Sequence, residues 1–438
     1  MSRGAAVTGA AVAIAAASLL LPWALAFDPQ AWVVWGRDVG RFALDTGGGP
    51  SWKPLPVVIT TPLALTGDPA PALWLLVART GGLLAIAGAA VLGARLGGAV
   101  AGAAAAALMA LSTWWFFNTA LGNSEGMLAA AVLWAVIAHL AGRHRAALAC
   151  AAAAGLLRPE VWPFLGLYGL WLWRHDRGAR PAVVAAAIVV PLLWIAPDLA
   201  GTGGLASASR AARGEPSLGS AALEDVPGLA VLADFWVFLT APALIAAVVV
   251  VIVGGRTVRV LAAGAVAWVA IVAVMAQAGY AGNPRYLVAA AAIGCVLAGV
   301  GAARVWPWAA VIVVAIGAVI TAPDLRDQAT DVAHRADRRE ALPDVVAAAG
   351  GRNQLVACQI HTAPAARPLV AWELDIDMRG IDRPPEHPDF VIRMRPYGGG
   401  PLDPALNPFG YDPIARAPGW EIWRGCVNPA AASAARGG

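Results

Sequence analysis

A few ionisable residues interrupt a sequence that is otherwise strongly apolar, and their types suit proton transfer beside a bound anion. Asp28 follows the first apolar run, Glu125 opens a later run, and Arg285 comes immediately before another. A carboxylate can accept a proton from a hydroxyl, and a guanidinium can bind a phosphate through two parallel hydrogen bonds. If these residues meet in space, they form a base and a phosphate site at one edge of the apolar region.

Each acid also has an ordinary explanation when it is considered alone. A single aspartate where a helix emerges, such as Asp28, is most often simply solvated, and a glutamate at a helix N-terminus, such as Glu125, is favoured by the helix dipole. Asn118 and Asn123 lie close to Glu125 in the segment "NTALGNSEG". Two acids on one face of a membrane enzyme would serve as a base and as an orienting group.

The residues around the two arginines leave similar alternatives. Arg158 and Glu160 interrupt an apolar stretch, where charges line a cavity, contact a substrate or pair with each other to hold a kink. Arg285 is fixed at a helix start by the preceding proline, and at head-group level it favours a lipid phosphate. Tyr286 either belongs to that phosphate site or is an interface anchor.

Lys53 lies in a proline-rich segment, "GPSWKPLPVV", that forbids a long regular helix. The segment is therefore expected to be structured at the membrane surface. The lysine either extends its ammonium group along the interface beside Trp52 or approaches a diphosphate or sugar phosphate.

The composition places these residues in a polytopic membrane protein. Hydrophobic residues make up 59% of the 438 residues and charged residues 13%, which is too apolar for a set of water-soluble domains. We expect a membrane all-α bundle of about eleven transmembrane helices. The two candidates on either side of Arg158 and Glu160 are short and could merge into one kinked element. The candidate spans are residues 4–26, 70–95, 99–117, 127–140, 146–157, 161–173, 181–200, 234–254, 258–278, 286–303 and 305–322.

Basic residues fix the expected orientation. Clusters at 142–145, 174–180 and 255–259, together with Arg3 and Arg304, fall on one side if the spans alternate, and the positive-inside rule makes that side cytoplasmic. The outer loops are then 27–69 and 201–233, and the tail is also outside the cytoplasmic membrane. The first span could instead be a cleaved signal peptide, although its length favours retention.

The chain is expected to divide near residue 322. Residues 1–322 form the transmembrane domain, and residues 323–438 form a small C-terminal α/β extracytoplasmic domain. In that domain, 324–349 reads as a charged helix, and 353–360, 389–395 and 419–426 read as strands. Cys358 and Cys426 lie near the ends of two of these strands, where an oxidising compartment permits a disulfide.

Several function classes find no support in the sequence. It contains no GxGxxG motif, P-loop or zinc-ligand spacing. The arginines lie in short clusters between apolar runs, so no face for nucleic acid is predicted. His144 and His175 belong to basic turns, and His361 and His387 to loops of the tail, so a metal site made of histidines is not expected.

The ordered motifs resemble those of a known enzyme family. Asp28 after the first span, "KPLP" at 53–56, Glu125 at the start of a later span, "LLRPE" at 156–160 and "NPRYL" at 283–287 follow one another as they do in GT-C fold polytopic membrane glycosyltransferases. The nearest branch is similar to the protein O-mannosyltransferase and aminoarabinose transferase group. The resemblance covers most of the chain in layout and only short segments in motif.

The resemblance implies a glycosyltransferase that moves a sugar from a polyprenyl-phosphate donor to an acceptor outside the cytoplasmic membrane. Asp28 would be the general base, and Glu125 the second, less secure catalytic acid. The donor phosphate would be bound by Arg285, Tyr286 and Lys53. The residues that line the cavity would be Arg158, Glu160 and Asn123.

Other readings remain open on the sequence alone. The sugar, whether hexose or pentose, and the acceptor, whether glycan, lipid or protein, are not specified. Neither is the presence of a divalent metal between Asp28, Glu125 and the phosphate. A transporter or flippase of a lipid-linked or small polar substrate is the main alternative, and a non-catalytic scaffold is a third. The sequence shows no internal repeat of the kind that many transporters have.

Overall fold

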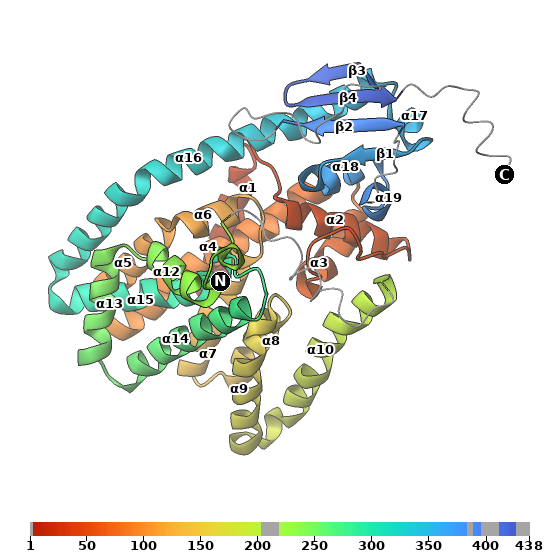
Figure 1. Cartoon of the computed structure of the whole chain (residues 1–438). Helices are drawn as coiled ribbons and strands as arrows, with labels where there is room; N and C mark the ends of the chain where they lie inside the picture. Colours follow the sequence, from red (N-terminus) through yellow and green to blue (C-terminus); the bar gives the residue numbers. More distant parts are fainter. Residues whose placement is uncertain (1–2, 203–218, 383–388, 396–410, 426–438) are drawn as a thin grey trace.

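A bundle of helices carries a small sheet at one end (Figure 1). This computed structural model describes residues 3–202, 219–382, 389–395 and 411–425. The helices of the bundle are α1 (Arg3–Ser18), α2 (Phe27–Gly40), α3 (Pro54–Ala64), α4 (Ala70–Gly97), α5 (Ala99–Ala110), α6 (Thr113–Ala120), α7 (Glu125–Leu140), α8 (His144–Gly155), α9 (Trp162–His175), α10 (Arg180–Thr202), α12 (Pro227–Phe238), α13 (Ala241–Val253), α14 (Arg256–Gln277), α15 (Val288–Val305) and α16 (Pro307–Ala348). Short 3-10 turns include η1 (Pro159–Val161) and η4 (Pro284–Leu287).

The apolar composition of the helices indicates that the bundle lies in a membrane. Five helices in the described part of the chain are long and apolar enough to cross a membrane, or six if the bent pair α5 and α6 forms one span, and four shorter apolar helices accompany them. The chain is therefore a multi-pass membrane protein, and the count of eleven spans stays a prediction. Helix α15 is the central element, because 89% of its apolar window is buried by its neighbours.

The structure divides several segments differently from the prediction. The expected outer loop 27–69 contains helices α2 and α3, and the expected loop 201–233 contains the start of α12. The expected span 234–254 is broken between α12 and α13, where Leu239 and Thr240 have extended backbone. The segments around Arg158 remain two separate helices, α8 and α9, joined through η1, because Pro159 starts a new turn there.

The last span and the charged segment after it form one helix. Sequence patterns predicted separate elements at 305–322 and 324–349, but α16 runs unbroken through both for 42 residues. The proposed domain boundary after residue 322 therefore lies within a continuous helix. Helix α16 extends along the bundle and reaches the sheet (Figure 1).

The C-terminal part has a four-stranded sheet with order β1-β2-β4-β3. Its strands are β1 (Ile360–Thr362), β2 (Phe390–Met394), β3 (Tyr411–Ala417) and β4 (Trp420–Gly425), and its helices are α17 (Arg352–Val356), α18 (Arg367–Leu374) and α19 (Arg379–Asp382). Strands β1 and β2 are parallel, and the other two pairings are antiparallel. The expectation of a small C-terminal α/β unit is confirmed for the described residues.

Two of the three predicted strands are confirmed, as β2 and β4, and β3 was not predicted. The strand prediction at 353–360 was wrong, because the first half of this segment belongs to the helix α17 and pairing begins only at Ile360. His361 consequently lies in β1 and not in a loop. His387 and Cys426 lie outside the described residues, so the disulfide with Cys358 stays a prediction.

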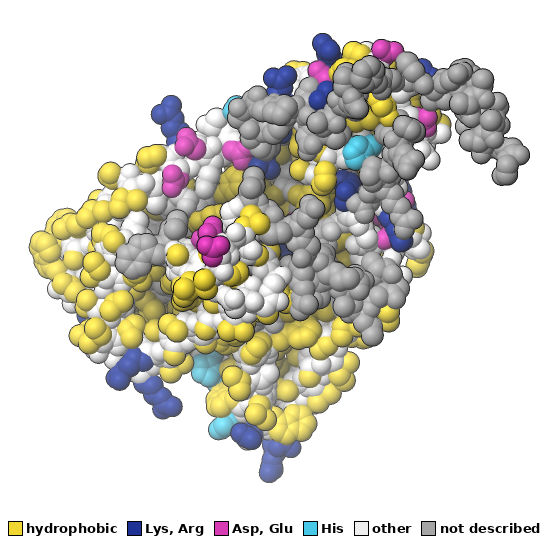
Figure 2. All heavy atoms as spheres, in the orientation of Figure 1, with side chains coloured by type: hydrophobic (Ala, Val, Ile, Leu, Met, Phe, Trp, Pro, Cys, Tyr) yellow, Lys and Arg dark blue, Asp and Glu magenta, His cyan; other side chains and the backbone are white. Residues whose placement is uncertain are grey.

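The basic turns gather at one end of the molecule. The C-terminal ends of α7 and α9 and the N-terminal ends of α8 and α14 line one common cavity, and arginine side chains lie at the lower end of the molecule below a broad hydrophobic band (Figure 2). The sequence assigned His144 and His175 to separate turns, but in the structure they gather with His139 at this end. The rings of His139, His144 and His175 all lie within 5.3 Å of the Trp171 ring, centroid to centroid, because these helix ends meet and their flat rings pack together.

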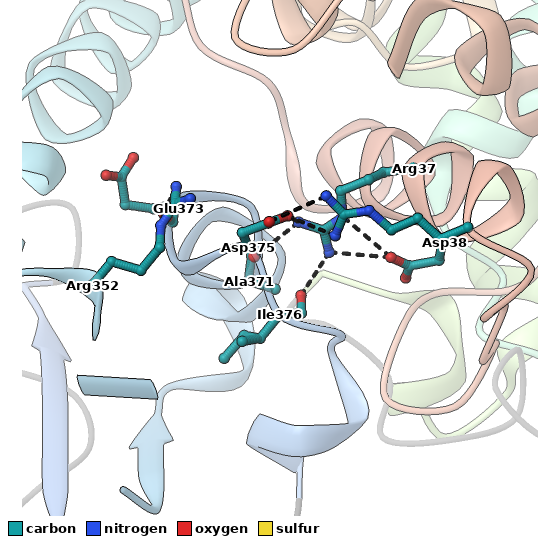
Figure 3. Close-up of polar contacts among 8 residues, drawn as sticks. Arg37, Asp38, Arg352, Ala371, Glu373, Asp375 and Ile376 are labelled. Carbon is teal, nitrogen blue, oxygen red and sulfur yellow. Dashed lines mark hydrogen bonds and ion pairs between the residues drawn. The ribbon is translucent and has the colours of Figure 1, made fainter. Parts of the chain in front are cut away.

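Helix α2 holds the C-terminal unit through a buried arginine. Arg37 donates hydrogen bonds to Asp375 Oδ1 at 2.9 Å, to the Ile376 carbonyl oxygen at 2.7 Å and to the Ala371 carbonyl oxygen at 3.4 Å, and it pairs with Asp38 at 3.2 Å. These contacts run between α2 and the end of α18 (Figure 3). A guanidinium holds its donors in one rigid plane, and here they bind two backbone carbonyl oxygens at the end of α18. We therefore expect α2 and α18 to move together.

Substitution of Gly301 tests the close packing of α15 against α13. A Cβ atom at Gly301 would overlap the Ala246 carbonyl oxygen, which belongs to the backbone and cannot turn aside. Gly301→Ala should destabilise the protein by roughly 1–3 kcal/mol, visible as a lower thermal unfolding midpoint of the detergent-solubilised chain. Gly166→Ala is the matched control, because nothing lies within 4 Å of its added Cβ. Equal midpoints for the two variants would contradict this packing.

Removal of Arg37 tests the link between α2 and α18. Arg37→Ala leaves the buried Asp38 without its cation and should cost about 3 kcal/mol of stability. Arg41→Ala removes a second partner of Asp375, but the Arg41 side chain is 52% exposed, so this control should cost under about 1 kcal/mol. Thermal unfolding and protease sensitivity of the C-terminal unit report both values. A control that is as damaging as Arg37→Ala would show that the buried pairing is not the decisive contact.

Candidate active site

The sequence-predicted residues come together at one rim of the bundle, where several helices begin or end. Asp28 lies in the first turn of α2, Lys53 directly precedes α3, Glu125 is the first residue of α7, Arg158 connects α8 to η1, and Arg285 lies in η4 before α15. Ion pairs join Asp28 to Arg285 and join Lys53 and Arg158 to Glu125. The Tyr286 ring, which contacts both Arg158 and Arg285, connects the two groups into one charged cluster.

Asp28 and Arg285 form the more open part of the cluster. An Arg285 guanidinium nitrogen, Nη2, lies 2.7 Å from Asp28 Oδ2, and Nη1 lies 3.4 Å from Asn123 Oδ1. The backbone holds Arg285 in place, because Asn283 accepts a hydrogen bond from its amide and Pro284 starts the turn. With 21% of the Arg285 side chain and 11% of the Asp28 side chain exposed, this pair is the part of the cluster that a ligand can reach.

Glu125 lies at the buried centre of the cluster between two cations. Its Oε1 atom is 3.5 Å from Lys53 Nζ and 3.6 Å from the Arg158 guanidinium, and its side chain has no exposed surface. Lys53 Nζ also donates a hydrogen bond to Ser124 Oγ at 3.0 Å and lies 5.0 Å from the centre of the Trp32 ring. Glu125 therefore acts as the shared counter-ion that keeps both cations at the rim.

Arg158 connects this centre to the residues beside Arg285. It donates a hydrogen bond to Glu160 Oε1 at 2.9 Å, and its guanidinium stacks on the Tyr286 ring at 3.7 Å. The Arg–Glu pair that the sequence left as one alternative is thus present, and Arg158 also contacts Glu125. The planar guanidinium and the aromatic face attract each other, which fixes the ring of Tyr286 next to the phosphate-binding candidate.

The positive and negative charges in the cluster balance, but several of its buried polar atoms lack a hydrogen-bond partner. Three cations and three carboxylates occupy it, and burial lowers the pKa of Lys53 to about 8, against the opposing effect of the nearby Glu125 carboxylate. Several buried polar atoms have no hydrogen-bond partner among the described residues: both Glu125 carboxylate oxygens, Glu160 Oε2, Arg158 Nε and Arg285 Nε. Such unpaired buried atoms are costly, so they indicate a site built to receive polar ligand atoms or water.

Two residues that contact the charged cluster, Trp32 and Ser124, were not predicted from the sequence. Trp32 follows Asp28 by four residues, so both lie on one face of α2, and Ser124 is the neighbour of Glu125 in the chain. The four-residue spacing on a predicted helix could have identified Trp32. The role of Ser124 depends on the approach of Lys53, a contact over 71 residues of chain that no local pattern reveals.

The donor set of the cluster does not fit a divalent metal. Asp28 and Glu125 each face a cation, and among the described residues no group of three or more His, Cys, Asp or Glu side chains is placed to hold a metal ion. The three histidines around Trp171 do not form such a group either.

An apolar cavity of about 610 Å³ adjoins the cluster. At the rim it includes Val161, which follows Glu160, and Trp268, which donates a hydrogen bond to the Tyr286 carbonyl oxygen. At the other end it reaches His139 and Arg256, at the basic turns. The cavity thus runs along the helices from the charged rim toward the opposite side, a shape that suits a long hydrocarbon chain whose polar end stays at the rim.

Comparison with known proteins identifies the fold. No protein-family model and no curated protein matches the chain. Two solved structures of ArnT from Cupriavidus metallidurans are similar over nearly the whole length of both proteins. The structure in the apo state has a TM-score of 0.55 at 15% identity and covers 95% of this chain and 98% of that one. The structure bound to undecaprenyl phosphate has a TM-score of 0.54 at 13% identity and covers 98% and 99%.

At this level of identity the likeness concerns the fold. ArnT is an aminoarabinose transferase with the GT-C fold, which is the group that the ordered motifs of the sequence resemble. The structural match extends from the bundle into the C-terminal unit, since almost the entire chain is covered. The chain therefore has the fold of the GT-C membrane glycosyltransferases, as its sequence motifs indicated.

Proposed function

We propose that this protein is a membrane glycosyltransferase that moves a sugar from a polyprenyl-phosphate donor to an acceptor hydroxyl, with Asp28 as the general base. The observation that carries the proposal is the Asp28–Arg285 pair at 2.7 Å, which is partly open and lies beside the apolar cavity. A base, a phosphate-binding cation and a hydrocarbon site are the three parts that this reaction needs. The GT-C fold shared with ArnT, whose solved structures include one bound to undecaprenyl phosphate, supports the same conclusion.

The donor would bind with its phosphate at Arg285 and its prenyl chain in the apolar cavity. Lys53 supplies the second cation from its fixed place beside Glu125, and the Asp28 partner of Arg285 is the one that a phosphate can replace. When the phosphate takes over the guanidinium of Arg285, the Asp28 carboxylate loses its partner. Donor binding thus frees the base at the moment when the sugar arrives.

The reaction is a single displacement at the anomeric carbon. The acceptor oxygen forms a bond to that carbon while Asp28 accepts its proton, and the bond from the anomeric carbon to the phosphate oxygen breaks. The electron pair of the broken bond remains on the polyprenyl phosphate, whose added negative charge is stabilised by Arg285 and Lys53. The proton then passes from Asp28 to solvent. The configuration of the sugar is inverted, because the nucleophile enters opposite the leaving group.

The remaining predicted residues would hold this geometry. The sequence assigned Glu125 a catalytic role, but its complete burial between two cations favours a positioning role, which we adopt here. Arg158, Glu160 and Tyr286 would keep the rim rigid through their pairing and stacking. Asn123 would orient the Arg285 guanidinium through its side-chain oxygen.

The orientation proposed from the basic turns places the reaction outside the cytoplasmic membrane. The charged cluster and the basic turns lie at opposite ends of α7, α9 and α15. If the basic end is cytoplasmic, the donor head group, the acceptor and the C-terminal unit meet on the outer side, in the cell envelope. A glycan, a lipid or a protein of the envelope would then be the acceptor.

Replacement of Asp28 tests the proposed base. In membranes supplied with radiolabelled polyprenyl-phosphate sugars, Asp28→Asn should reduce sugar transfer by about 10²- to 10⁴-fold, because the amide cannot accept the proton. Consumption of the lipid-linked sugar and formation of labelled product are measured together. Asp327→Asn on the exposed part of α16 should leave both unchanged.

Two outcomes of this assay would contradict the proposal. A native chain that carries label across the membrane without forming product would be a transporter. Transfer by Asp28→Asn at the native rate would remove Asp28 as the base.

The titration of Lys53 gives a second test. Its lowered pKa of about 8 means that the ammonium is mostly charged at pH 7 and mostly neutral at pH 9. Transfer should therefore fall as pH rises through about 8, since the departing phosphate loses a stabilising cation. Lys53→Arg keeps its charge across this range and should shift the fall in activity above pH 9. An alkaline limb at the same pH in both proteins would show that another group controls it.

A further inference from the structure

A second, polar cavity lies on the face of α2 that points away from the charged cluster. It has a volume of about 710 Å³ and lies between α2, α18, α16 and the segment before α2. Its walls carry planar polar groups and two tryptophans, among them Trp23, Gln30, Arg37, Arg352, Trp372 and Asp375. Cavities of this size commonly bind small molecules.

Helix geometry separates this cavity from the reacting groups. Gln30 follows Asp28 by two residues, which turns it about 200° around the helix, whereas Gln30 and Arg37 are seven residues apart and share a face. Asp28 contacts Arg285, and Arg37 contacts α18. The two sites thus use opposite sides of one helix, about 10 Å across with its side chains.

One buried donor in this cavity has no partner. Only 5% of the surface of Gln30 is exposed, and its Nε2 atom makes no hydrogen bond to any described residue. An unpaired buried amide is costly unless a ligand completes it. Gln30 lines the cavity, and its Nε2 atom has almost no accessible surface, so a rotation of the side-chain amide would bring this donor to a ligand oxygen.

The charges that line the cavity balance, because four arginines and four acidic residues contribute to it. Arg41 binds both carboxylate oxygens of Asp375, at 2.8 Å and 3.1 Å, and Arg37 binds the same group at 2.9 Å. Arg339 pairs with Glu340 at 2.7 Å. A phosphate or another strong anion would have to displace these carboxylates, so the cavity favours an uncharged polar ligand.

Aromatic surface and further polar groups complete the lining. The Arg339 guanidinium covers one side of the Trp23 ring at 3.6 Å, and Arg37 lies 5.6 Å from the centre of the Trp372 ring. Arg352 donates to the Glu373 carbonyl oxygen at 2.9 Å, and both residues lie beside Asp375 at the end of α18 (Figure 3). Flat apolar rings next to amide, guanidinium and carboxylate groups match a sugar, whose ring faces present C–H groups and whose edge carries O–H groups.

We infer that this cavity is a saccharide-binding site that takes a remote part of an extended acceptor glycan. The designation as acceptor rests on the proposed function, whereas the binding of a saccharide does not. Since the thickness of α2 separates the cavity from Asp28, one sugar residue cannot touch both sites, and the ligand must contain several residues.

Direct binding tests the inference without any donor. The full chain in phosphatidylcholine nanodiscs is titrated calorimetrically with linear tetrasaccharides of glucose, galactose, mannose or arabinose. At least one should bind, and Gln30→Met, which keeps the side-chain length but removes the donor, should weaken it about three- to tenfold. Trp372→Leu should also weaken it, and Asp327→Asn on the exposed part of α16 should bind as the native chain does. Unfolding midpoints show whether each variant is folded.

A measurement on the native chain makes the test independent of the variants. Bound tetrasaccharide should protect Trp23 and Trp372 from hydroxyl-radical labelling. The inference is overturned if no tetrasaccharide binds, if these tryptophans are not protected, or if Gln30→Met and Trp372→Leu both bind as the native chain does. Saccharide binding without any transfer would refute the proposed function alone, and transfer to a tetrasaccharide that does not occupy the cavity would refute this inference alone.

Discussion

The mutual neutralisation of buried charges at one rim of the bundle is the constraint on which the site depends. Glu125 has no exposed side-chain surface and lies between Lys53 and Arg158, so none of these three could stay ionised without the others. Each comes from a different helix end, and their attraction therefore fixes how the ends of α3, α7 and α8 meet. Asp28 and Arg285, at the open side, make their contact on this rigid base, which leaves one ion pair available for exchange with a ligand.

Helix α2 connects this rim to the C-terminal unit. One face carries Asp28 and Trp32 toward the charged cluster, and the other carries Arg37 into a network with Asp375 and the end of α18. A shift of the C-terminal unit would therefore shift the helix that holds the proposed base. This arrangement gives the unit a physical role in the site, even though its strands lie away from the reacting atoms.

The sequence was sufficient for the outline of the site because a membrane restricts where polar residues can lie. Spans that alternate in direction place every second helix end on the same side, so Asp28, Glu125 and Arg285 could be assigned to one face before any coordinates were considered. The contacts between distant segments could not be predicted. Arg37 and Asp375 are 338 residues apart, and the histidine rings around Trp171 come from three helices. The helix α17 was missed because a short apolar run is compatible with a strand or a helix.

A structure of the full chain with a bound polyprenyl phosphate tests the central claim most directly. The account predicts that the phosphate lies within about 3 Å of the Arg285 guanidinium, that Asp28 no longer pairs with Arg285, and that the prenyl chain follows the apolar cavity past Trp268 toward Arg256. A phosphate bound at the basic turns, or an Asp28–Arg285 pair that stays closed while the lipid binds elsewhere, would contradict it.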